Sequence, residues 1–505
     1  MRVERPASRY DSGMEIEFKL SCTPDTARAL GRHLTRLSGA APHKLQLQNT
    51  YYDTPNQDLR AQGIALRIRK QGRLKLQTVK CAGIVSGGLS SRPEWETPYG
   101  GRFDFSAVDT AEVRHTLETL AHLPGYRATL DTDFSRHVWH WRPEAGTDIE
   151  IVIDRGRIVA GGREEAICEI ELELVSGEPT RLLDLVAHLG TLAALFPAPL
   201  SKATRGSRLL SGPEKPPPVV ATHAPHADTA FNALAQSCLD HISINLPTNV
   251  ARFCDDNLHQ VRVGLRRLRA LLQMFQPLLR DGWPRKAIVH GARNHMQALA
   301  EARELHVLLH EAVTPAADTL APRAAQALHK QLDSMYQRAF AAAEAHLLTQ
   351  AFSTWLLHTS LALHAQPLRQ KTGTQAWPAQ AQALLAKQIA VYSKQLKRTQ
   401  PEATSLHELR KHGKHLRYQL AASALHPAVG KALAHLQETL GGLNDLHVTG
   451  EIFGRLPPPH AESIAAITKH HHPRQTQLLL RAAGQLKQLR RALHKLPAKS
   501  GKGRT

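Results

Sequence analysis

The sequence predicts an α+β protein with a β-rich first half and an all-α second half. Three observations support this division. Short alternating segments dominate before about residue 210, helical periodicity dominates after about residue 228, and a proline-rich stretch separates the two regions. At 505 residues the chain is also too long for a single hydrophobic core. We therefore expect two domains with a spacer between them.

The first half consists of short runs of alternating polar and apolar residues, separated by Gly, Pro and Asn. Side chains of a strand point alternately to its two faces, so these runs are typical of strands. The expected strands are residues 15–20, 64–70, 74–79, 95–98, 134–141, 149–154 and 167–175. Together they predict a β-rich domain with a few helices.

The second half repeats Ala, Leu, Gln, His and Arg with helical spacing and has almost no strand signal. The expected helices are residues 229–244, 256–279, 287–312, 322–364, 378–397, 405–425 and 430–440. These patterns predict a helical bundle. The expected organisation is an N-terminal extension (1–13), a β domain (14–210), a Pro-rich linker (211–227), a helical domain (228–495) and a basic tail (496–505).

Positive charge is concentrated in the second half. The chain has a formal net charge of +20; residues 1–215 carry 29 basic and 27 acidic side chains, whereas residues 216–505 carry 35 basic and 17 acidic ones. A field of this sign concentrates polyanions such as nucleic acid, inorganic polyphosphate or an anionic membrane. The charge alone leaves these three partners open.

Cysteine usage and hydropathy indicate a cellular compartment. The five cysteines are odd in number and form no CxxC pair, which argues against a disulfide framework and fits a reducing compartment. No apolar run follows the first arginines, and no apolar stretch is long enough to span a bilayer. We expect a soluble, cytoplasmic protein without a membrane partner.

The segment from Glu15 to Lys19 alternates charged and apolar residues. As a strand it places Glu15, Glu17 and Lys19 on one face. One such strand is usually the solvated side of an antiparallel sheet. Here, however, the pattern recurs with separated signs, acidic at Glu150, Asp154, Glu169, Glu171 and Glu173, and basic at Arg67, Arg69, Lys80 and Arg136. Facing each other, these strands would offer oxygens to a hard divalent cation and cations to phosphate.

An ordered set of motifs runs through residues 14–210. It comprises Glu15-x-Glu17-x-Lys19, Tyr52-Asp53-Thr54-Pro55, Ala65 to Arg69, Gln77 to Lys80, Arg92-Pro93-Glu94-Trp95-Glu96, Arg136 followed by Trp139, Asp154, the Glu-rich strand from Cys168, and Ser201-Lys202 with Arg205-Gly206. This set resembles the CYTH family, also called triphosphate tunnel metalloenzymes. The resemblance implies antiparallel strands closed into a tunnel-shaped barrel, with Mg²⁺ or Mn²⁺ and a triphosphate inside.

The resemblance also implies roles for the matching residues. The implied metal ligands are Glu15, Glu17, Asp154, Glu169 and Glu171. The implied substrate-binding residues are Lys19, Arg67, Arg69, Lys80, Arg136, Lys202 and Arg205. Glu15, Glu17 and Lys19 form the implied catalytic motif, and Glu94, Glu96, Glu150 and Glu173 are candidates for supporting roles.

The expected reaction is hydrolysis of a triphosphate. Basic groups would neutralise its charge, and in-line attack by water on the terminal phosphorus needs no covalent enzyme intermediate. The stretch from Gln77 to Gly83, followed by Gly87-Gly88-Leu89, looks most like bacterial inorganic triphosphatases that carry a helical domain. We therefore expect cleavage of inorganic triphosphate to phosphate and diphosphate. The alternatives are a class IV-type adenylate cyclase, a thiamine triphosphatase and a non-catalytic polyphosphate-binding protein.

A duplicated segment stands out in the second half. LHQVRVGLRRLR from Leu258 recurs as LHELRKHGKHLR from Leu406. On a helix, the basic residues of the first copy share one face and its leucines fill the adjoining face. A solvated Arg-rich face is a common explanation for one such helix, but two matched copies favour a binding surface.

A second related pair, Arg303-Glu304-Leu305-His306-Val307 and Asn444-Asp445-Leu446-His447-Val448, follows the two copies. Over about residues 228–495 this pattern resembles the CHAD domain, which implies two related helical halves around a basic groove that binds inorganic polyphosphate. The implied ligands are His259, Arg262, Arg266, Arg269, His407, Arg410, Lys414 and Arg417. The family commonly has Arg-Asp-x-Asp-Val, so the departure after Arg303 weakens any role for that turn.

Nucleic acid is the rival ligand, because phosphate contacts alone would bind either polymer. Single strands are usually held by base stacking on aromatic rings, and only Tyr418 lies near the ends of the two copies. A linear polyphosphate is therefore favoured and nucleic acid disfavoured. The tract from His470 to His472, beside Lys469 and Pro473, is expected to be an exposed loop rather than a metal site.

Overall fold

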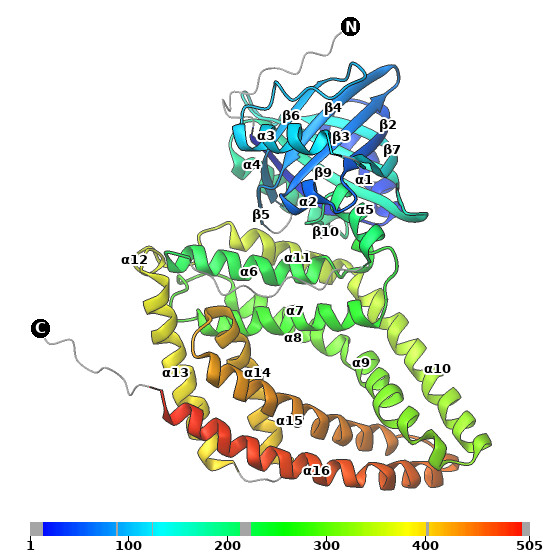
Figure 1. Ribbon diagram of the computed structural model, residues 1–505, viewed down its shortest axis with the longest axis vertical. Coiled ribbons are helices and arrows are strands. Elements are labelled where there is room, and N and C mark those ends of the chain that lie inside the picture. The colour runs from blue at the N-terminus through cyan, green and yellow to red at the C-terminus, as the bar shows by residue number, and fades with distance from the viewer. Residues whose placement is uncertain (1–13, 87–88, 124, 213–223, 400–402, 497–505) are drawn as a thin grey trace, which may run out of the picture. The chain divides into compact units, whose positions relative to one another are not determined.

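The computed structural model describes residues 14–86, 89–123, 125–212, 224–399 and 403–496 (Figure 1). The chain forms two compact units. Of the described residues, the first unit comprises those from 14 to 212 together with residues 243–253 and 348–361. The second unit comprises the described residues within 224–242, 254–347 and 362–496. Two segments of the second half of the sequence thus belong to the first unit.

The first unit is built on one antiparallel β-barrel. Its strands are β1 (Met14–Ser21), β2 (His43–Asp53), β3 (Ile64–Gln71), β4 (Leu74–Cys81), β5 (Ile84–Ser86), β6 (Leu89–Pro98), β7 (Arg127–Trp141), β8 (Asp148–Ala160), β9 (Arg163–Ser176) and β10 (Phe196–Pro197). The order β1-β9-β8-β7-β2-β3-β4-β6 closes on itself because β6 pairs back with β1. Short strands β10 and β5 extend it at β1 and β6. The predicted antiparallel barrel is confirmed.

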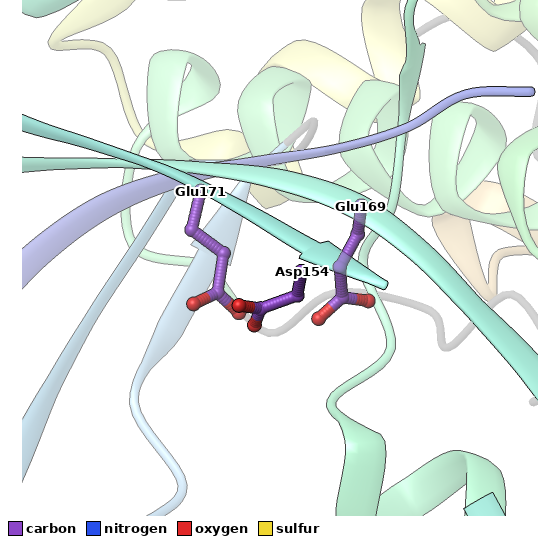
Figure 2. Close-up of side chains that lie close together, drawn as sticks. All are labelled: Asp154, Glu169 and Glu171. Atoms are coloured by element: carbon purple, nitrogen blue, oxygen red, sulfur yellow. The ribbon is translucent and has the colours of Figure 1, made fainter. Parts of the chain in front are cut away.

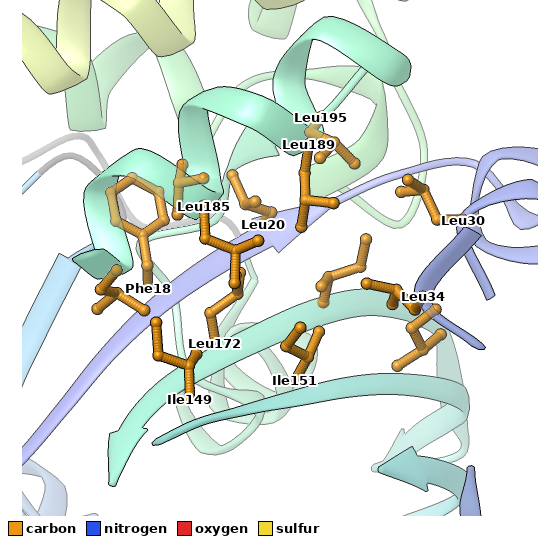
Figure 3. Close-up of a cluster of buried hydrophobic side chains, with 14 of the residues drawn as sticks. Phe18, Leu20, Leu30, Leu34, Ile149, Ile151, Leu172, Leu185, Leu189 and Leu195 are labelled. Atoms are coloured by element: carbon orange, nitrogen blue, oxygen red, sulfur yellow. The ribbon is translucent and has the colours of Figure 1, made fainter. Parts of the chain in front are cut away.

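Helices of the first unit cover the barrel wall. They are α1 (Pro24–Ser38), α2 (Asp58–Ala61), α3 (Ala111–Ala121), α4 (Pro179–Leu192), α5 (Lys202–Ser211) and α11 (Gln350–Leu363). Figure 3 shows the outward-facing side chains Phe18 and Leu20 of β1 in a core with residues of α1 and α4. Both are fully buried, while Glu17 and Lys19 line the barrel interior. The predicted alternation along β1 therefore holds at these positions.

Residues 243–253 and helix α11 complete the first unit beside β10. Ser353 Oγ donates to the carbonyl of Leu195 at 2.8 Å and accepts from its amide at 2.7 Å. Asn249 Nδ2 donates to the carbonyl of Pro197 at 3.1 Å. Leu357 belongs to the same core as Leu195, and both have 0% exposure. The barrel unit therefore depends on packing from far along the chain.

This packing makes a prediction about Leu357. Leu357→Ala should lower the free energy of unfolding of the barrel unit by about 2–4 kcal/mol, because it removes a buried side chain and leaves a cavity. Leu192→Ala is the matched control, because Leu192 is 47% exposed in α4 and its truncation should change stability by less than about 0.5 kcal/mol. Hydrogen exchange of barrel amides in denaturant measures both. Equal effects of the two variants would contradict the assigned packing.

The second unit is helical, as predicted. Its α-helices are α6 (Ala227–Ser243), α7 (Asp255–Met274), α8 (Arg285–Ala298), α9 (Ala300–Val307), α10 (Pro322–Leu347), α12 (Gln370–Gly373), α13 (Trp377–Arg398), α14 (Ala403–Ser423), α15 (Pro427–Phe453) and α16 (Ala461–His494). A π-helical segment (Leu308–Val313) follows α9. None of the helices in the described part of the chain has the length and apolar character needed to cross a bilayer.

Some expected helix boundaries were wrong. The single helix expected over 287–312 is interrupted at Leu299, between α8 and α9. The helix expected over 322–364 is divided into α10 and α11, and Thr349 marks the break because its Oγ1 accepts from the amide of Phe352 at 3.2 Å. The extension 1–13, most of the linker 211–227 and nearly all of the tail 496–505 lie outside the described residues.

The loop expected around the three consecutive histidines is also wrong, because this tract lies inside α16. His471 is buried and its Nε2 lies 2.8 Å from the carbonyl oxygen of Ala312. Pro473 is accommodated within the helix, although an interior proline costs about 3 kcal/mol. Ile467, Leu486 and Leu489 are buried along the same helix. Their packing offsets that cost.

Candidate functional site

The barrel encloses a charged cavity of about 70 Å³. Basic side chains outnumber acidic ones along it: Lys19, Arg67, Arg69, Lys80, Arg92, Arg136 and Lys202 face Glu17, Glu94, Glu171 and Glu173. These residues come from strands on all sides of the barrel and from the start of α5. An enclosed site with an excess of positive charge is suited to a small polyanion.

Three carboxylates, Asp154, Glu169 and Glu171, lie close together, and we call them the carboxylate triad (Figure 2). Of the three, Glu171 lines the cavity, and Lys202, which also lines it, contacts the other two. One oxygen from each lies within 4.8 Å of the others. Asp154 of β8 stands opposite Glu169 of β9 in the strand register, and Glu171 is the next residue on the same face. Asp154 is 0% exposed and Glu169 is 1% exposed. Oxygen donors at this spacing suit a hard divalent cation.

Cationic side chains surround the triad. Arg136 donates to Asp154 from Nε at 2.8 Å and from Nη2 at 2.7 Å, and Nη2 also donates to Glu171 at 2.7 Å. Lys202 Nζ lies 2.7 Å from Asp154 Oδ2 and 3.1 Å from Glu171 Oε1, and it also pairs with Glu169. Lys19 Nζ lies 2.8 Å from Glu171 Oε1. The ammonium of Lys202 therefore contacts all three carboxylates.

These contacts favour the ionised form of two carboxylates of the triad, Asp154 and Glu171. Burial by itself would raise the pKa of Glu171, but Lys19, Lys202 and Arg136 hold that pKa well below its usual value. Burial opposes ionisation of Asp154 as well, and Arg136 and Lys202 lower its pKa. Both carboxylates are therefore available to a cation at neutral pH.

The opposite wall carries the predicted phosphate-binding bases. Arg67 lies 3.7 Å and Lys80 2.7 Å from Glu94, and Arg69 lies 3.7 Å from Glu96. Burial, then the charges of Arg67 and Arg136, lower the pKa of Arg69 to about 10. It stays protonated at neutral pH but is repelled by its neighbours. A phosphate group bound here would relieve that repulsion.

Of the remaining predicted site residues, some line the cavity and others do not. Glu17 lines the cavity and pairs with Arg92. Glu15 stands opposite Arg92 in the β1–β6 register, but its side chain is outside the described part of the structure. Arg205 is buried behind the triad, 2.5 Å from Glu165 and 3.1 Å from Glu169, and it does not line the cavity. Glu150 does not line it either, and lies 3.8 Å from His140.

Arg92, Tyr51 and Phe134 are among the residues that line the cavity but had no predicted role. Arg92 belongs to the Arg-Pro-Glu motif that the sequence shares with the CYTH family, so this motif could have identified it as a site residue. Tyr51 lies on β2, which was not predicted, and its hydroxyl accepts from Arg67 Nη1 at 3.3 Å. The ring of Phe134 lies with its centroid 4.9 Å from Lys202 Nζ and 5.8 Å from Arg136 Cζ, which favours cation–π attraction. No sequence pattern marks such a phenylalanine.

The second unit brings the duplicated segments together on α7 and α14. We call the eight predicted polyphosphate ligands on these helices the basic cluster. Leu258, Val261, Leu265 and Leu268 are buried, which confirms the apolar face of α7. Arg266 of α7 contributes to lowering the pKa of both Arg410 and Lys414 of α14, so the basic faces of the two helices approach each other.

Charges within the basic cluster lack full compensation. Burial, then Arg410 and Arg266, lower the pKa of Lys414 to about 7. The Nε atoms of Arg266 and Arg410 are buried and have no hydrogen-bond partner among the residues described. Arg303 of α9 lies near the basic cluster. Burial, then the charge of Arg303, lowers the pKa of His259 to about 4. Arg303 was not among the predicted ligands.

Comparison with known proteins matches both units. The family model of the CYTH domain matches residues 13–207, and that of the CHAD domain matches residues 233–454. The inorganic triphosphatase of Haemophilus influenzae is 35% identical over 194 residues, which are 38% of this chain and 54% of that protein. The chain therefore spans about half the length of this curated relative.

Two solved structures match parts of the chain. The crystal structure of the CHAD domain from the plant Ricinus communis is 25% identical to this chain, with a TM-score of 0.46. The match covers 57% of this chain and 98% of the plant domain. A putative adenylyl cyclase from Hippeastrum, described as having a dominant triphosphatase activity, is 19% identical to this chain, with a TM-score of 0.30. The match covers 40% of this chain and 98% of the Hippeastrum protein. On the two family matches, this chain contains a CYTH domain followed by a CHAD domain.

Proposed function

We propose that the chain is a metal-dependent triphosphatase that cleaves inorganic triphosphate to phosphate and diphosphate. The observation that carries this proposal is the carboxylate triad, with Glu171 at the wall of a barrel cavity in which basic side chains outnumber acidic ones. The match to an inorganic triphosphatase over the β domain supports the choice of substrate. An enclosed, highly charged cavity without a large apolar surface also favours a ligand that consists of phosphate alone.

The triad fits the metal that the family implies. We assign Asp154, Glu169 and Glu171, together with Glu15 and Glu17, as ligands for Mg²⁺ or Mn²⁺, which both prefer carboxylate oxygens. The ammonium of Lys202 contacts all three carboxylates of the triad. A divalent cation would therefore compete with this ammonium for the carboxylate oxygens. When bound, a divalent cation would supply additional positive charge against the phosphate oxygens.

The remaining bases supply binding and charge neutralisation. We assign Lys19, Arg67, Arg69, Lys80, Arg136 and Lys202 to the phosphate oxygens. Since they come from several walls of the barrel, they can hold different phosphates of one chain at once. Neutralised charge on the terminal phosphate favours in-line attack by water. Arg205 supports Glu169 from behind rather than binding substrate, and Arg92 positions Glu17.

Product analysis on purified full-length protein tests this function. The protein is incubated with Mg²⁺ or Mn²⁺ and inorganic triphosphate, thiamine triphosphate, ATP or long-chain polyphosphate. We expect fastest phosphate release from inorganic triphosphate. Cyclic AMP from ATP would indicate an adenylate cyclase, and preferred cleavage of thiamine triphosphate would indicate a thiamine triphosphatase. Binding without turnover of any of them would indicate a polyphosphate-binding protein.

For the helical domain we propose that the basic cluster binds inorganic polyphosphate. The buried, unpartnered Nε atoms of Arg266 and Arg410 support an anionic ligand. Tyr418 packs against Arg417, whose Cζ lies 4.9 Å from the ring centroid, so this ring already has a partner within the protein. This arrangement favours polyphosphate over single-stranded nucleic acid. We further propose that the protein acts in the cytoplasm.

Lys414 predicts a pH dependence of this binding. Its pKa of about 7 is depressed below 10.5 by burial and by Arg410, Arg266 and Arg262, with Asp445 opposing them. A bound polyanion raises that pKa, so binding takes up a proton above pH 7. Affinity should therefore fall by about tenfold between pH 6 and pH 8.

Titration calorimetry with polyphosphate at fixed ionic strength measures this dependence. Lys414→Arg keeps the charge at all pH values in this range and should remove most of the change in affinity. Lys414→Met should bind weakly at both pH values. If Lys414→Arg retained the full pH dependence, another group would be responsible and the assignment to Lys414 would be wrong.

A further inference from the structure

Two cysteines meet on the barrel wall where β1 ends beside β9. The sulfur atoms of Cys22 and Cys168 lie 3.9 Å apart, although 146 residues separate them in sequence. The amide of Cys22 donates to the carbonyl of Cys168 at 3.2 Å, which continues the register that places Ser21 opposite Glu169. The two thiols are therefore held side by side by the β-ladder.

We propose that Cys22 and Cys168 form a redox-sensitive pair that a peroxide converts into an intramolecular disulfide. The sulfur atoms must approach by about 2 Å to reach the S–S bond length, a distance within reach of side-chain rotation on adjacent strands. Cys22 is 4% exposed, whereas Cys168 is partly exposed. Peroxide therefore reaches Cys168 first, and Cys22 is the neighbouring thiol that completes the bond.

One molecule of peroxide is the only oxidant that formation of this disulfide requires. The thiol of Cys168 attacks one peroxide oxygen, the O–O bond breaks, and a sulfenic acid and one water form. The sulfur of Cys22 then attacks the Cys168 sulfur, the S–O bond breaks, and a second water leaves as the disulfide forms. The two thiols lose two electrons and two protons in total, and the peroxide is reduced to two waters.

The pair is coupled to the carboxylate triad through the backbone. Glu169 directly follows Cys168 and points to the opposite face of β9, into the barrel, where it contacts Lys202 and Arg205. A bond from Cys168 to Cys22 fixes the Cys168 side chain and backbone against β1, and so it restricts the orientation of the adjacent Glu169. We expect the oxidised protein to bind Mn²⁺ about tenfold more weakly, since small changes in ligand orientation have effects of this size. This consequence rests on the proposed metal site.

Peptide mapping of full-length protein tests the pair itself. After treatment with hydrogen peroxide, alkylation and digestion, mass spectrometry should find a Cys22–Cys168 crosslinked peptide that dithiothreitol removes. Cys254→Ser, which removes an exposed thiol, should leave the crosslink intact, and Cys168→Ser should abolish it. The oxidised wild-type protein should unfold at a temperature roughly 5 °C or more higher than the reduced protein, because the bond closes a long loop. No crosslink in the folded wild-type protein would overturn the proposal.

Calorimetry with Mn²⁺ alone tests the coupling to the triad. The reduced protein should bind more tightly than the oxidised protein, and Cys168→Ser should be insensitive to peroxide. An unchanged Mn²⁺ affinity in a fully crosslinked sample would overturn the coupling. If neither redox form cleaved triphosphate, the proposed function would fail, but the peptide map and the Mn²⁺ titration would still decide the present proposal.

Discussion

Replacing Glu171 with Gln is expected to reduce triphosphate hydrolysis by roughly 10³-fold or more, because it removes one carboxylate of the triad that we propose as the metal site and that compensates the surrounding bases. Glu171 contacts Lys19, Arg136 and Lys202, all within 3.1 Å. The amide has nearly the same shape but cannot carry the charge. Both the affinity for Mn²⁺ and the rate should therefore fall. Phosphate release at saturating triphosphate and calorimetry with Mn²⁺ measure the two effects.

A matched variant separates this effect from a general loss of acidic charge. Glu164 lies on the same strand, is largely exposed and pairs with Arg157 at 3.2 Å, so Glu164→Gln should retain wild-type activity. Thermal unfolding of both variants is needed, because loss of a buried carboxylate also leaves cations less compensated. A folded Glu171→Gln protein with wild-type turnover would contradict the assigned role of the triad.

Reversing Arg266 and Arg410 together is expected to weaken polyphosphate binding by about 100-fold or more at low salt, since two attractive charges become repulsive. These residues lie on α7 and α14, where the two basic faces approach each other. Binding of long-chain polyphosphate to the full-length protein, measured across salt concentrations, should also show a shallower salt dependence in the double variant Arg266→Glu, Arg410→Glu.

The control has the same change in net charge. Arg323 and Lys330 are exposed on α10, so Arg323→Glu with Lys330→Glu should reduce affinity only slightly through the overall field. Circular dichroism shows whether a loss of affinity comes from lost contacts with polyphosphate or from lost helical structure. Loss of helical structure in the Arg266 and Arg410 variant, or an equal loss of affinity in the control, would mean that the basic faces serve the fold or only the net charge.

Alternation of polar and apolar residues was sufficient to predict the charged interior strands. β1, and β9 from Cys168 to Leu174, keep a strict period of two, so their inward carboxylates could be named in advance. β2 was not predicted because its buried face contains Asn49, which is 1% exposed and donates to Thr132 Oγ1 at 2.8 Å. A polar residue satisfied by a distant strand interrupts the apolar pattern, and its partner cannot be read from local sequence.

The arrangement of the site depends on contacts between distant segments. Glu17 and Arg92 become partners only because β1 pairs with β6 and closes the barrel. The position of Lys202 among the triad depends on where α5 begins, at the Ser201 cap. The duplicated helices were easier to predict, because each carries its own amphipathic pattern, but the contribution of Arg303 depends on how α9 packs. Residue types could thus be predicted, whereas their partners could not.

We propose that the carboxylate triad and the basic cavity hydrolyse inorganic triphosphate by attack of water on a terminal phosphorus. The most direct test is ³¹P NMR of triphosphate incubated with the protein and Mg²⁺ or Mn²⁺ in ¹⁸O-labelled water. We expect equal amounts of phosphate and diphosphate, with the label in the phosphate, and loss of both products in Glu171→Gln. Unchanged triphosphate with the folded wild-type protein, or equal product formation by Glu171→Gln, would contradict it.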